Sequence, residues 1–477
     1  MYQTDQLITF WSQIKPNDLA FVDDENEVTF SALDAITRKV CQVINEKGLK
    51  QGELVSIILP SYLGWLFTLS LYRLGIATVA QNNMDPFSTK VTPDWLISLE
   101  PHSGIALVRT VLINDDLLAT INSAPAMAKM PGFKSPDDLA TLFSTSGTTG
   151  ETKHIAESAE ELRNFSYRPG WNDSFGDEGI LNLFMFGAAW ANRHALKSLM
   201  LGRTYYSCIF YDERLPKFMS KYPIRTIIGS PAQIASFLDT YERAMIKLPL
   251  LKTVVMGGSV PSQQMINRIK SNFDCKIFNT YGSVEAGFVG IFEMKDDNSR
   301  EFSIRPPVRM EIVDENDAPL RQGELGIVRY HRPDMATSYF KNPIASADFF
   351  KNGYFYPGDL GYFDPSGRLI LAGRINEVIN LGGAKLNPEE IDKIGLAQPG
   401  VIDCATIAIP GPSGVEQLAI AVVANSGFDL EAFKESMASN SPFTISAVFL
   451  VGKVARNDNG KIMRSILSQQ YQDSTSS

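Results

Sequence analysis

Short apolar runs of strand length alternate with longer amphipathic stretches along most of the chain. The runs Thr226–Gly229 and Thr253–Met256 are each followed by a helix-like stretch, at Pro231–Tyr241 and Pro261–Ile269. Lys276–Asn279 is the next strand candidate. Alternation of strands and helices is typical of parallel sheets covered by helices, so we expect an α/β fold.

One uncharged stretch, Leu54–Tyr72, is long enough to raise the question of a membrane span. Pro60 and Ser61 interrupt it, and both favour a turn. We therefore expect a buried strand at Leu54–Leu59, followed by a buried helix from Ser61 to about Leu74, and no membrane span.

The texture changes after about residue 306. Met310–Val313, Gly326–Tyr330 and Gly361–Asp364 have the character of strands without long helices between them. The sequence Asp364-Pro-Ser-Gly367 predicts a turn, and Arg368–Ala372 the strand that follows it. This part of the chain is predicted to form a small antiparallel element.

From about Ile375 the chain has the pattern of a separate α+β unit. Asn387 before Pro388 is a typical helix start, because asparagine caps and proline suits the first turn. The unit spans roughly 100 residues, a normal domain size. We expect a large N-terminal domain, 1–374, and a small mobile α+β domain, 375–477. The other elements expected there are strands at Ala405–Ile409 and Leu418–Val423, helices at Leu430–Met437 and Lys461–Gln469, and a disordered tail, Tyr471–Ser477.

Composition narrows the function classes. The 477 residues include 44% hydrophobic and 20% charged side chains, the balance of a soluble globular protein, and the net charge is -9. That charge argues against a nucleic-acid surface. The four cysteines and four histidines are scattered, so neither a disulfide framework nor a zinc site is expected. Residues 1–18 lack the basic start of a signal peptide, and a reducing, cytoplasmic location fits best.

The densest chemical signal is a loop rich in Gly, Ser and Thr that runs from Thr141 to Lys153 behind an apolar strand. Glycines let backbone N–H groups converge on an anion, the hydroxyls add neutral donors, and the lysine adds a positive charge. These groups suit a triphosphate, although the spacing is not that of a Walker A loop. On composition alone, a flexible linker remains an equal alternative.

At this loop the chain resembles the adenylate-forming superfamily of acyl-CoA synthetases, peptide-synthetase adenylation domains and luciferases. The family signature [ST]SGTTGxPKG reads here Ser144-Thr-Ser-Gly-Thr-Thr-Gly-Glu-Thr-Lys-His154. Five later segments match family motifs in order: Gly257-Gly-Ser-Val-Pro261, Asn279-Thr-Tyr-Gly-Ser-Val-Glu285, Gly353-Tyr-Phe-Tyr-Pro-Gly-Asp-Leu360, Gly373-Arg374 with Gly383 and Glu389-Glu-Ile391, and Asn459-Gly-Lys-Ile-Met-Arg464. The resemblance covers nearly the whole chain, and six motifs in order make it highly specific.

The resemblance implies roles for the matching residues. ATP would be the cofactor and Glu285 would hold its Mg²⁺, while Lys461 would bridge the acid and the α-phosphate in the transition state. Asp359 would contact the ribose, Arg374 would contact the ribose or a phosphate, and Asn376 would be the hinge. The phosphates would be held by Lys153 and by Ser144, Thr145, Ser146, Gly147, Thr148, Thr149 and Gly150. The adenine would be lined by Gly258, Asn279, Tyr281, Gly282 and Ser283.

The chain departs from the family pattern at several positions. Near Lys153 the family's proline and glycine are Thr152 and His154. Since the main groups remain, we expect the chain to catalyse adenylation. We expect the departures to affect the transfer of the acyl group to a thiol more than adenylation. The other departures are Val284, Pro357, Asn376 and Asn380.

The bound acid is constrained at Ala189, the position where activators of α-amino acids keep an aspartate. Alanine cannot pair with an ammonium group, so a fatty, aryl or polyketide-like acid is favoured. Phe186, Ala189 and Gly257 are the expected pocket residues. The apolar run Leu183–Trp190 fits either a pocket wall or a core strand. Arg193 and His194 fit either a polar substrate tail or, more commonly, the surface.

Three functions remain after the sequence is read. The first is an acid–thiol ligase that uses CoA. The second is a stand-alone adenylating enzyme that acts on an acyl carrier protein. The third is a non-catalytic homologue that binds an acyl-adenylate, against which the retention of Lys153 and Lys461 speaks, because a binding protein has little need of a transition-state lysine. The oligomeric state is not predicted.

Overall fold

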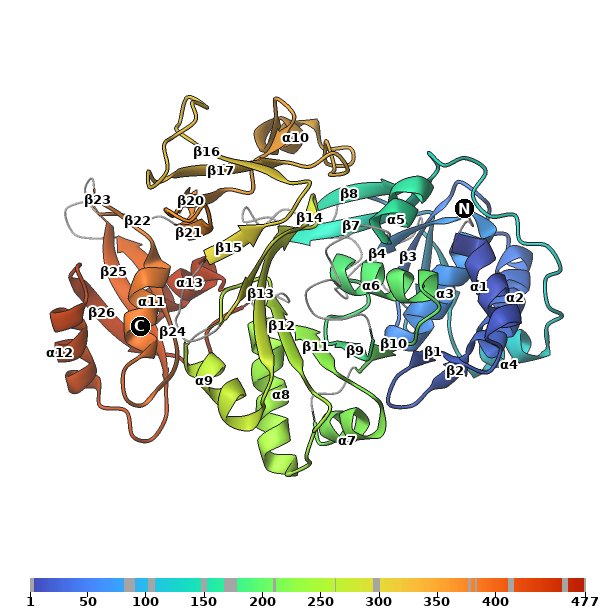
Figure 1. Cartoon of the computed structure of the whole chain (residues 1–477), viewed down its shortest axis with the longest axis horizontal. Coiled ribbons are helices and arrows are strands. Elements are labelled where there is room, and N and C mark those ends of the chain that lie inside the picture. Colours follow the sequence, from blue (N-terminus) through green and yellow to red (C-terminus); the bar gives the residue numbers. More distant parts are fainter. Residues whose placement is uncertain are drawn as a thin grey trace.

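The computed structural model describes residues 4–80, 91–101, 108–146, 152–166, 178–208, 212–261, 263–294, 301–375, 379–381, 384–410, 416–456 and 462–475. The chain runs from the N-terminal helices at one end of the molecule, through a central sheet, to the C-terminal α+β part at the other end (Figure 1). The helices are α1 Thr4–Ile14, α2 Phe30–Glu46, α3 Ser61–Leu74, α4 Asp115–Ser123, α5 Ala159–Ser166, α6 Ala189–Met200, α7 Arg214–Lys221, α8 Pro231–Ala244, α9 Gln263–Asn272, α10 Pro343–Phe349, α11 Pro388–Leu396, α12 Leu430–Asn440 and α13 Arg464–Thr475.

Two sheets of largely parallel strands form the N-terminal part. The first has the order β6–β5–β3–β4–β7–β8, and its strands are parallel except β8, which pairs antiparallel with β7. These strands are β3 Leu54–Ile58, β4 Ala77–Ala80, β5 Trp95–Ser98, β6 Arg109–Leu112, β7 Leu139–Ser146 and β8 Thr152–Ser158.

The second sheet runs through the middle of the molecule. Its parallel section has the order β13–β12–β11–β9–β10–β1, and β2 closes its edge antiparallel to β1. The strands are β1 Leu19–Val22, β2 Glu27–Thr29, β9 Ile180–Asn182, β10 Tyr205–Ser207, β11 Thr226–Gly229, β12 Thr253–Gly257 and β13 Lys276–Ser283. The expected α/β fold with helix-covered parallel sheets is confirmed.

The second sheet continues into the antiparallel element expected after residue 306. From β13 the pairing passes antiparallel through β14, β15, β21, β20 and β17. The strands are β14 Gly287–Glu293, β15 Glu301–Ile304, β16 Arg309–Val313, β17 Gly326–His331, β18 Phe350–Lys351, β19 Tyr354–Phe355, β20 Asp359–Phe363 and β21 Leu369–Arg374.

The C-terminal part has its own sheet and core. The hairpin of β22 Ile379–Leu381 and β23 Ala384–Leu386 precedes α11, and a sheet of β24 Val401–Pro410, β25 Glu416–Ala424 and β26 Ile445–Leu450 follows it. Asn387 caps α11 as expected, because its side chain accepts a hydrogen bond from the Glu389 N–H. Two apolar clusters, around Ile420 and Leu467, bury residues of this part alone. The boundary at residue 374 stays a prediction.

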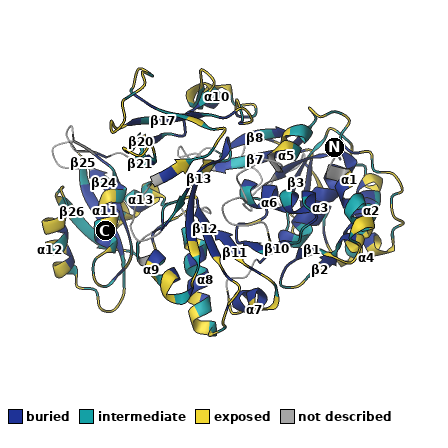
Figure 2. Cartoon of the chain, in the orientation of Figure 1, coloured by how far each residue is buried: buried dark blue, intermediate teal, exposed yellow. Residues whose placement is uncertain are grey.

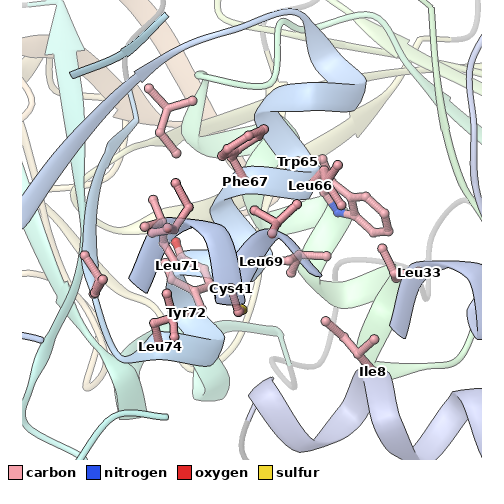
Figure 3. Close-up of a cluster of buried hydrophobic side chains, with 14 of the residues drawn as sticks. Ile8, Leu33, Cys41, Trp65, Leu66, Phe67, Leu69, Leu71, Tyr72 and Leu74 are labelled. Carbon is pink, nitrogen blue, oxygen red and sulfur yellow. The ribbon is translucent and has the colours of Figure 1, made fainter. Parts of the chain in front are cut away.

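Helix α3 explains the long uncharged stretch. It is buried on nearly all sides, between α2, α1 and the first sheet (Figures 2 and 3). Its one charged residue, Arg73, is fully buried and pairs with Asp34 of α2 at 2.7 Å. Among the described residues no helix is long and apolar enough to cross a membrane. The expected strand and helix at this place are confirmed.

Two sequence expectations are wrong, and one of two alternatives is excluded. Leu183–Trp190 is no core strand, since β9 ends at Asn182 and α6 begins at Ala189. The last helix begins at Arg464 rather than at Lys461. It continues to Thr475, through most of the tail expected to be disordered. In each case an apolar or polar run lacked a clear period, so only tertiary packing decides the element.

Candidate active site

The phosphate segment forms the two arms of a hairpin. Antiparallel pairing of β7 with β8 sets Ser144 opposite His154, Thr145 opposite Lys153 and Ser146 opposite Thr152. Thr145 is buried and Ser144 is half-buried. The tip of the hairpin, with the predicted Gly147, Thr148, Thr149 and Gly150, lies outside the described residues.

Lys153 lies under aromatic rings rather than in solvent. Its side chain is buried, and the ammonium nitrogen is 3.8 Å from the ring centroid of Phe349 and 5.3 Å from that of Tyr339. Cation–π attraction of this kind holds a desolvated ammonium without neutralising it. The neighbouring His154 is buried too, and desolvation lowers its pKa to about 4, so this histidine adds no positive charge at neutral pH.

Glu285 lies in the turn between β13 and β14. Its carboxylate is buried and accepts a 2.7 Å hydrogen bond from the hydroxyl of Tyr339. Burial, with the charge of Glu285, raises the pKa of Tyr339, so this hydroxyl stays a donor. Tyr339 therefore contacts both the predicted metal ligand, through its hydroxyl, and Lys153, through its ring. No sequence pattern marked Tyr339, because both contacts depend on the tertiary fold.

Asp359 and Arg374 lie opposite each other on β20 and β21. The guanidinium Nε of Arg374 is 2.8 Å from one carboxylate oxygen of Asp359, and the Tyr281 hydroxyl donates to the other oxygen at 2.5 Å. Burial raises the pKa of Tyr281 well above its usual value, and the Asp359 charge adds to the rise. These contacts fix the orientation of a buried carboxylate.

Tyr330 contacts both Tyr281 and the end of β13. Its hydroxyl donates to Ser283 at 3.3 Å, and its ring is 6.2 Å from that of Tyr281. Burial raises the pKa of Tyr330, and the charges of Glu285 and Asp359 contribute to the rise. The predicted ribose and adenine residues are thus linked to one another around the end of β13, next to the turn that carries Glu285.

Gly257 and Gly258, at the end of β12, occupy positions that disfavour a larger side chain. A Cβ on Gly257 would lie 2.5 Å from the indole carbon Cζ3 of Trp190, while Gly258 has a φ of 89°, a left-handed conformation that favours glycine. Asn279 is buried, and its side-chain oxygen accepts no hydrogen bond within the described part of the chain. Gly282 packs against the backbone carbonyl of Gly287.

The predicted pocket residues fall into two clusters. Ala189 packs with Phe143 and Val284, so it lies beside the start of the phosphate hairpin and the residue before Glu285. Phe186 belongs instead to the large N-terminal core, where it faces Gly64 of α3. The ring of Trp190 stacks on Phe184, 5.3 Å away.

The more common of the two interpretations of Arg193 and His194, a place at the surface, is wrong. Both are buried in α6. Arg193 forms an ion pair with Glu157 of β8, and its Nη2 also donates to the Val284 carbonyl at 3.0 Å. His194 lies edge-on to Tyr205, and desolvation lowers its pKa to about 3.

Two predicted residues, Lys461 and Asn376, lie outside the described residues. Described residues on both sides of Lys461 are anchored in the C-terminal part. Arg456 pairs with Asp403 at 2.9 Å, and Arg464 pairs with the buried Asp392 at 2.6 Å. Arg464 also donates to the Thr406 carbonyl.

The donor set suits one kind of metal ion. Within the described ranges, no three His, Cys, Asp or Glu side chains converge as an all-protein metal cage would require. A single buried carboxylate such as Glu285 fits Mg²⁺, which usually takes one or two carboxylates together with substrate phosphates and water.

Comparison with known proteins identifies relatives over nearly the whole chain. The family model described as "AMP-binding enzyme" matches residues 9–340. The 4-chlorobenzoate–CoA ligase of Arthrobacter sp is 25% identical over an alignment of 507 residues, which covers 97% of this chain and 94% of that protein.

Solved structures share the fold. The anthranilate CoA ligase AuaEII in complex with anthranoyl-AMP superposes with a TM-score of 0.87 at 17% identity, covering 100% of this chain and 98% of that one. ATP-bound MatB from Rhodopseudomonas palustris gives a TM-score of 0.84 at 20% identity, with 99% of both chains covered.

Proposed function

Because the chain belongs to the AMP-binding enzyme family, we propose that it activates a carboxylic acid with ATP and passes the acyl group to CoA. The sequence-based prediction of the adenylate-forming superfamily is confirmed. At the level of the family, the prediction of an AMP-forming acid–thiol ligase is confirmed as well, since relatives are named CoA ligases. The substrate and the roles of single residues are proposals.

One observation carries the proposal: Tyr339 contacts Lys153 and Glu285 together. A cation and a carboxylate held side by side at the base of the phosphate hairpin can bind the two parts of a metal–triphosphate complex. Lys153 would attract the phosphate oxygens and Glu285 would hold Mg²⁺. When bound, Mg²⁺ would neutralise charge on the pyrophosphate that leaves.

The nucleoside would lie beside Asp359, in the group of residues linked around the end of β13. Asp359 would accept hydrogen bonds from the ribose hydroxyls, since Tyr281 and Arg374 already hold its carboxylate in one orientation. Adenine would lie against Gly258, which follows β12. Asn279, with its buried unpaired oxygen, would offer an acceptor for the exocyclic amine.

The reaction would proceed in two steps. In the first, a carboxylate oxygen of the acid attacks the α-phosphorus of ATP, and the bond to pyrophosphate breaks. In the second, the thiolate sulfur of CoA attacks the acyl carbonyl, and AMP leaves. Lys461 would offset the charge that builds on the α-phosphate in the first step, so its removal should lower the rate more than the affinity for ATP.

The proposed acid is fatty, aryl or polyketide-like. Ala189, Phe143 and Val284 are apolar neighbours that provide no partner for an α-ammonium group. The Trp190 ring against Gly257 limits the depth of the site, which favours a compact acid.

Exchange of labelled pyrophosphate into ATP tests the proposal, measured over a panel of fatty, aryl and amino acids. Exchange with compact apolar acids and none with α-amino acids is the expected result. Adding CoA or a holo acyl carrier protein to the responsive acid then separates the two thiol acceptors, and thioester should form with CoA. ATP binding without exchange for any acid would overturn the enzyme proposal in favour of the non-catalytic homologue.

A further inference from the structure

A buried ion pair joins three segments of the candidate active site. Arg193 of α6 and Glu157 of β8 have side chains only 7% and 8% exposed, and Nη2 of Arg193 donates to Oε1 of Glu157. The same nitrogen donates to the Val284 carbonyl at 3.0 Å. The guanidinium lies 5.0 Å from the ring centroid of Phe143, near the end of β7.

Each of these partners lies next to a residue with a proposed role or on the same strand as one. Glu157 lies on the same strand as Lys153, and Val284 immediately precedes Glu285. Phe143 immediately precedes Ser144, and Ala189 begins the helix that carries Arg193. Phe143, Ala189 and Val284 pack together in one apolar cluster. The guanidinium therefore connects the β7–β8 hairpin, helix α6 and the turn that carries Val284 and Glu285.

A substrate contact does not account for this arginine. Its side chain is buried, and within the described part of the chain it contacts a carboxylate, a main-chain carbonyl and an aromatic face. Stability does not account for it well either. A buried ion pair commonly adds little over apolar side chains of similar volume, although removing one partner alone is strongly destabilising.

We propose that Arg193 is a positioning residue: paired with Glu157, it holds the phosphate hairpin, α6 and the Val284–Glu285 segment in one register. This rests on the proposed function, because the register matters for bringing an acid carboxylate in line with the α-phosphorus. A misplacement of about 1 Å can lower a rate about 100-fold even when substrates still bind. A planar guanidinium with several donors in a fixed geometry suits this task, and lysine cannot reproduce it.

The decisive variant replaces both partners by apolar residues, Glu157→Leu with Arg193→Met. This double variant should fold with a melting temperature close to that of the wild type, because no unpaired charge is left buried. Its kcat for pyrophosphate exchange should fall about 10- to 100-fold, with a smaller change in KM for the acid. Arg193→Lys keeps the charge and should recover stability but only part of kcat. Wild-type kcat in the folded double variant would overturn the proposal.

A matched control is the ion pair of Arg329 with Glu311, 2.6 Å apart in the antiparallel element. The corresponding swap, Glu311→Leu with Arg329→Met, should leave kcat unchanged. If it lowers kcat as much as the swap at Arg193, the effect is general and the proposal is wrong.

Calorimetric ATP binding separates this inference from the proposed function. If the wild type binds ATP but exchanges with no acid, the enzyme proposal fails, and the positioning role is then judged on ATP affinity alone. The double variant should bind ATP about tenfold more weakly, since Lys153 and Glu285 are held less well. In that case, unchanged ATP affinity in the double variant would contradict the positioning role of Arg193. If the double variant does not fold, the same measurements on Arg193→Lys decide, and unchanged kcat and ATP affinity in that variant would overturn the proposal.

Discussion

The properties of the charged residues in this site depend on the side chains that they contact more than on their residue type. Glu285, Lys153 and Asp359 are ordinary charged residues in the sequence, yet all three are buried beside tyrosines or phenylalanines. Burial strengthens their electrostatic interactions, because the local dielectric is low. It also means that each charge depends on a few named contacts, which can be removed one at a time.

Tyr339→Phe removes one of these contacts and keeps the ring over Lys153. Glu285 then loses a buried donor, which should lower the free energy of unfolding by about 1–3 kcal/mol. If Glu285 holds Mg²⁺, the metal compensates for the missing hydroxyl. The rise in melting temperature on adding Mg²⁺ with ATP should therefore be larger in the variant than in the wild type.

Tyr330→Phe is the control for this experiment, since its hydroxyl contacts Ser283 and leaves Glu285 untouched. Equal metal-dependent shifts in wild type and Tyr339→Phe would show that Glu285 is not a metal ligand. ATP with a chelator should shift all three proteins alike.

Gly257→Ala tests the acid site. The new Cβ would lie 2.5 Å from Trp190 and 2.8 Å from the Thr280 hydroxyl oxygen, so the indole must move. Overpacking of this kind costs about 1–3 kcal/mol. We expect kcat/KM for the acid to fall about tenfold or more while calorimetric ATP affinity holds. Adding Trp190→Phe should restore part of the activity, and no recovery would place the acid elsewhere.

At the scale of elements, the sequence predicts regular strand–helix units well and irregular ones poorly. The turn at Pro60 and the proline at the start of the expected helix Pro231–Tyr241 are local signals, and β3, α3, β11 and α8 follow as expected. Helix α6 was missed because it is buried on nearly all sides, so its sequence lacks a clear apolar and polar face. The Arg193–Glu157 pair was missed for another reason. The two residues are distant in sequence, and only the packing of α6 against β8 brings them into contact.

Helix α6 gives a prediction about pH. His194 has a folded pKa of about 3, below the value of about 6.5 expected in the unfolded chain. As the pH falls below about 6.5, the unfolded state takes up the proton first, so stability is lost progressively down to the folded pKa. At pH 5 the free energy of unfolding should be about 2 kcal/mol lower than at neutral pH from this group alone.

His194→Phe removes the titrating group and keeps an aromatic ring against Tyr205. The free energy of unfolding, measured with a denaturant, should therefore decrease less steeply in the variant as the pH is lowered from about 6.5 to 5. Parallel stability curves for the two proteins would show that His194 is not a buried neutral group in the folded state.

On the scale of the whole molecule, the nucleotide residues come from segments far apart in the chain. Strands β7, β12, β13, β20 and β21 bring them to one region of the large part, while the C-terminal part adjoins the antiparallel element (Figure 1). The junction is held by the Ile375 N–H, which donates to the Gly358 carbonyl at 2.8 Å, and by Asn387, which donates to the Ala372 carbonyl. Motif order predicted this assembly, but no local pattern predicted the tyrosines that join its charged groups.

The most direct test of the account is mass spectrometry of the products from ATP, Mg²⁺ and the acid that supports exchange. Without a thiol, the wild type should accumulate the acyl-adenylate, and adding CoA should convert it to thioester and AMP. Lys461→Ala should bind ATP with near wild-type affinity and form acyl-adenylate at least about 100-fold more slowly. If the wild type yields no acyl-adenylate, or if Lys461→Ala forms it at the wild-type rate, the proposed mechanism is contradicted.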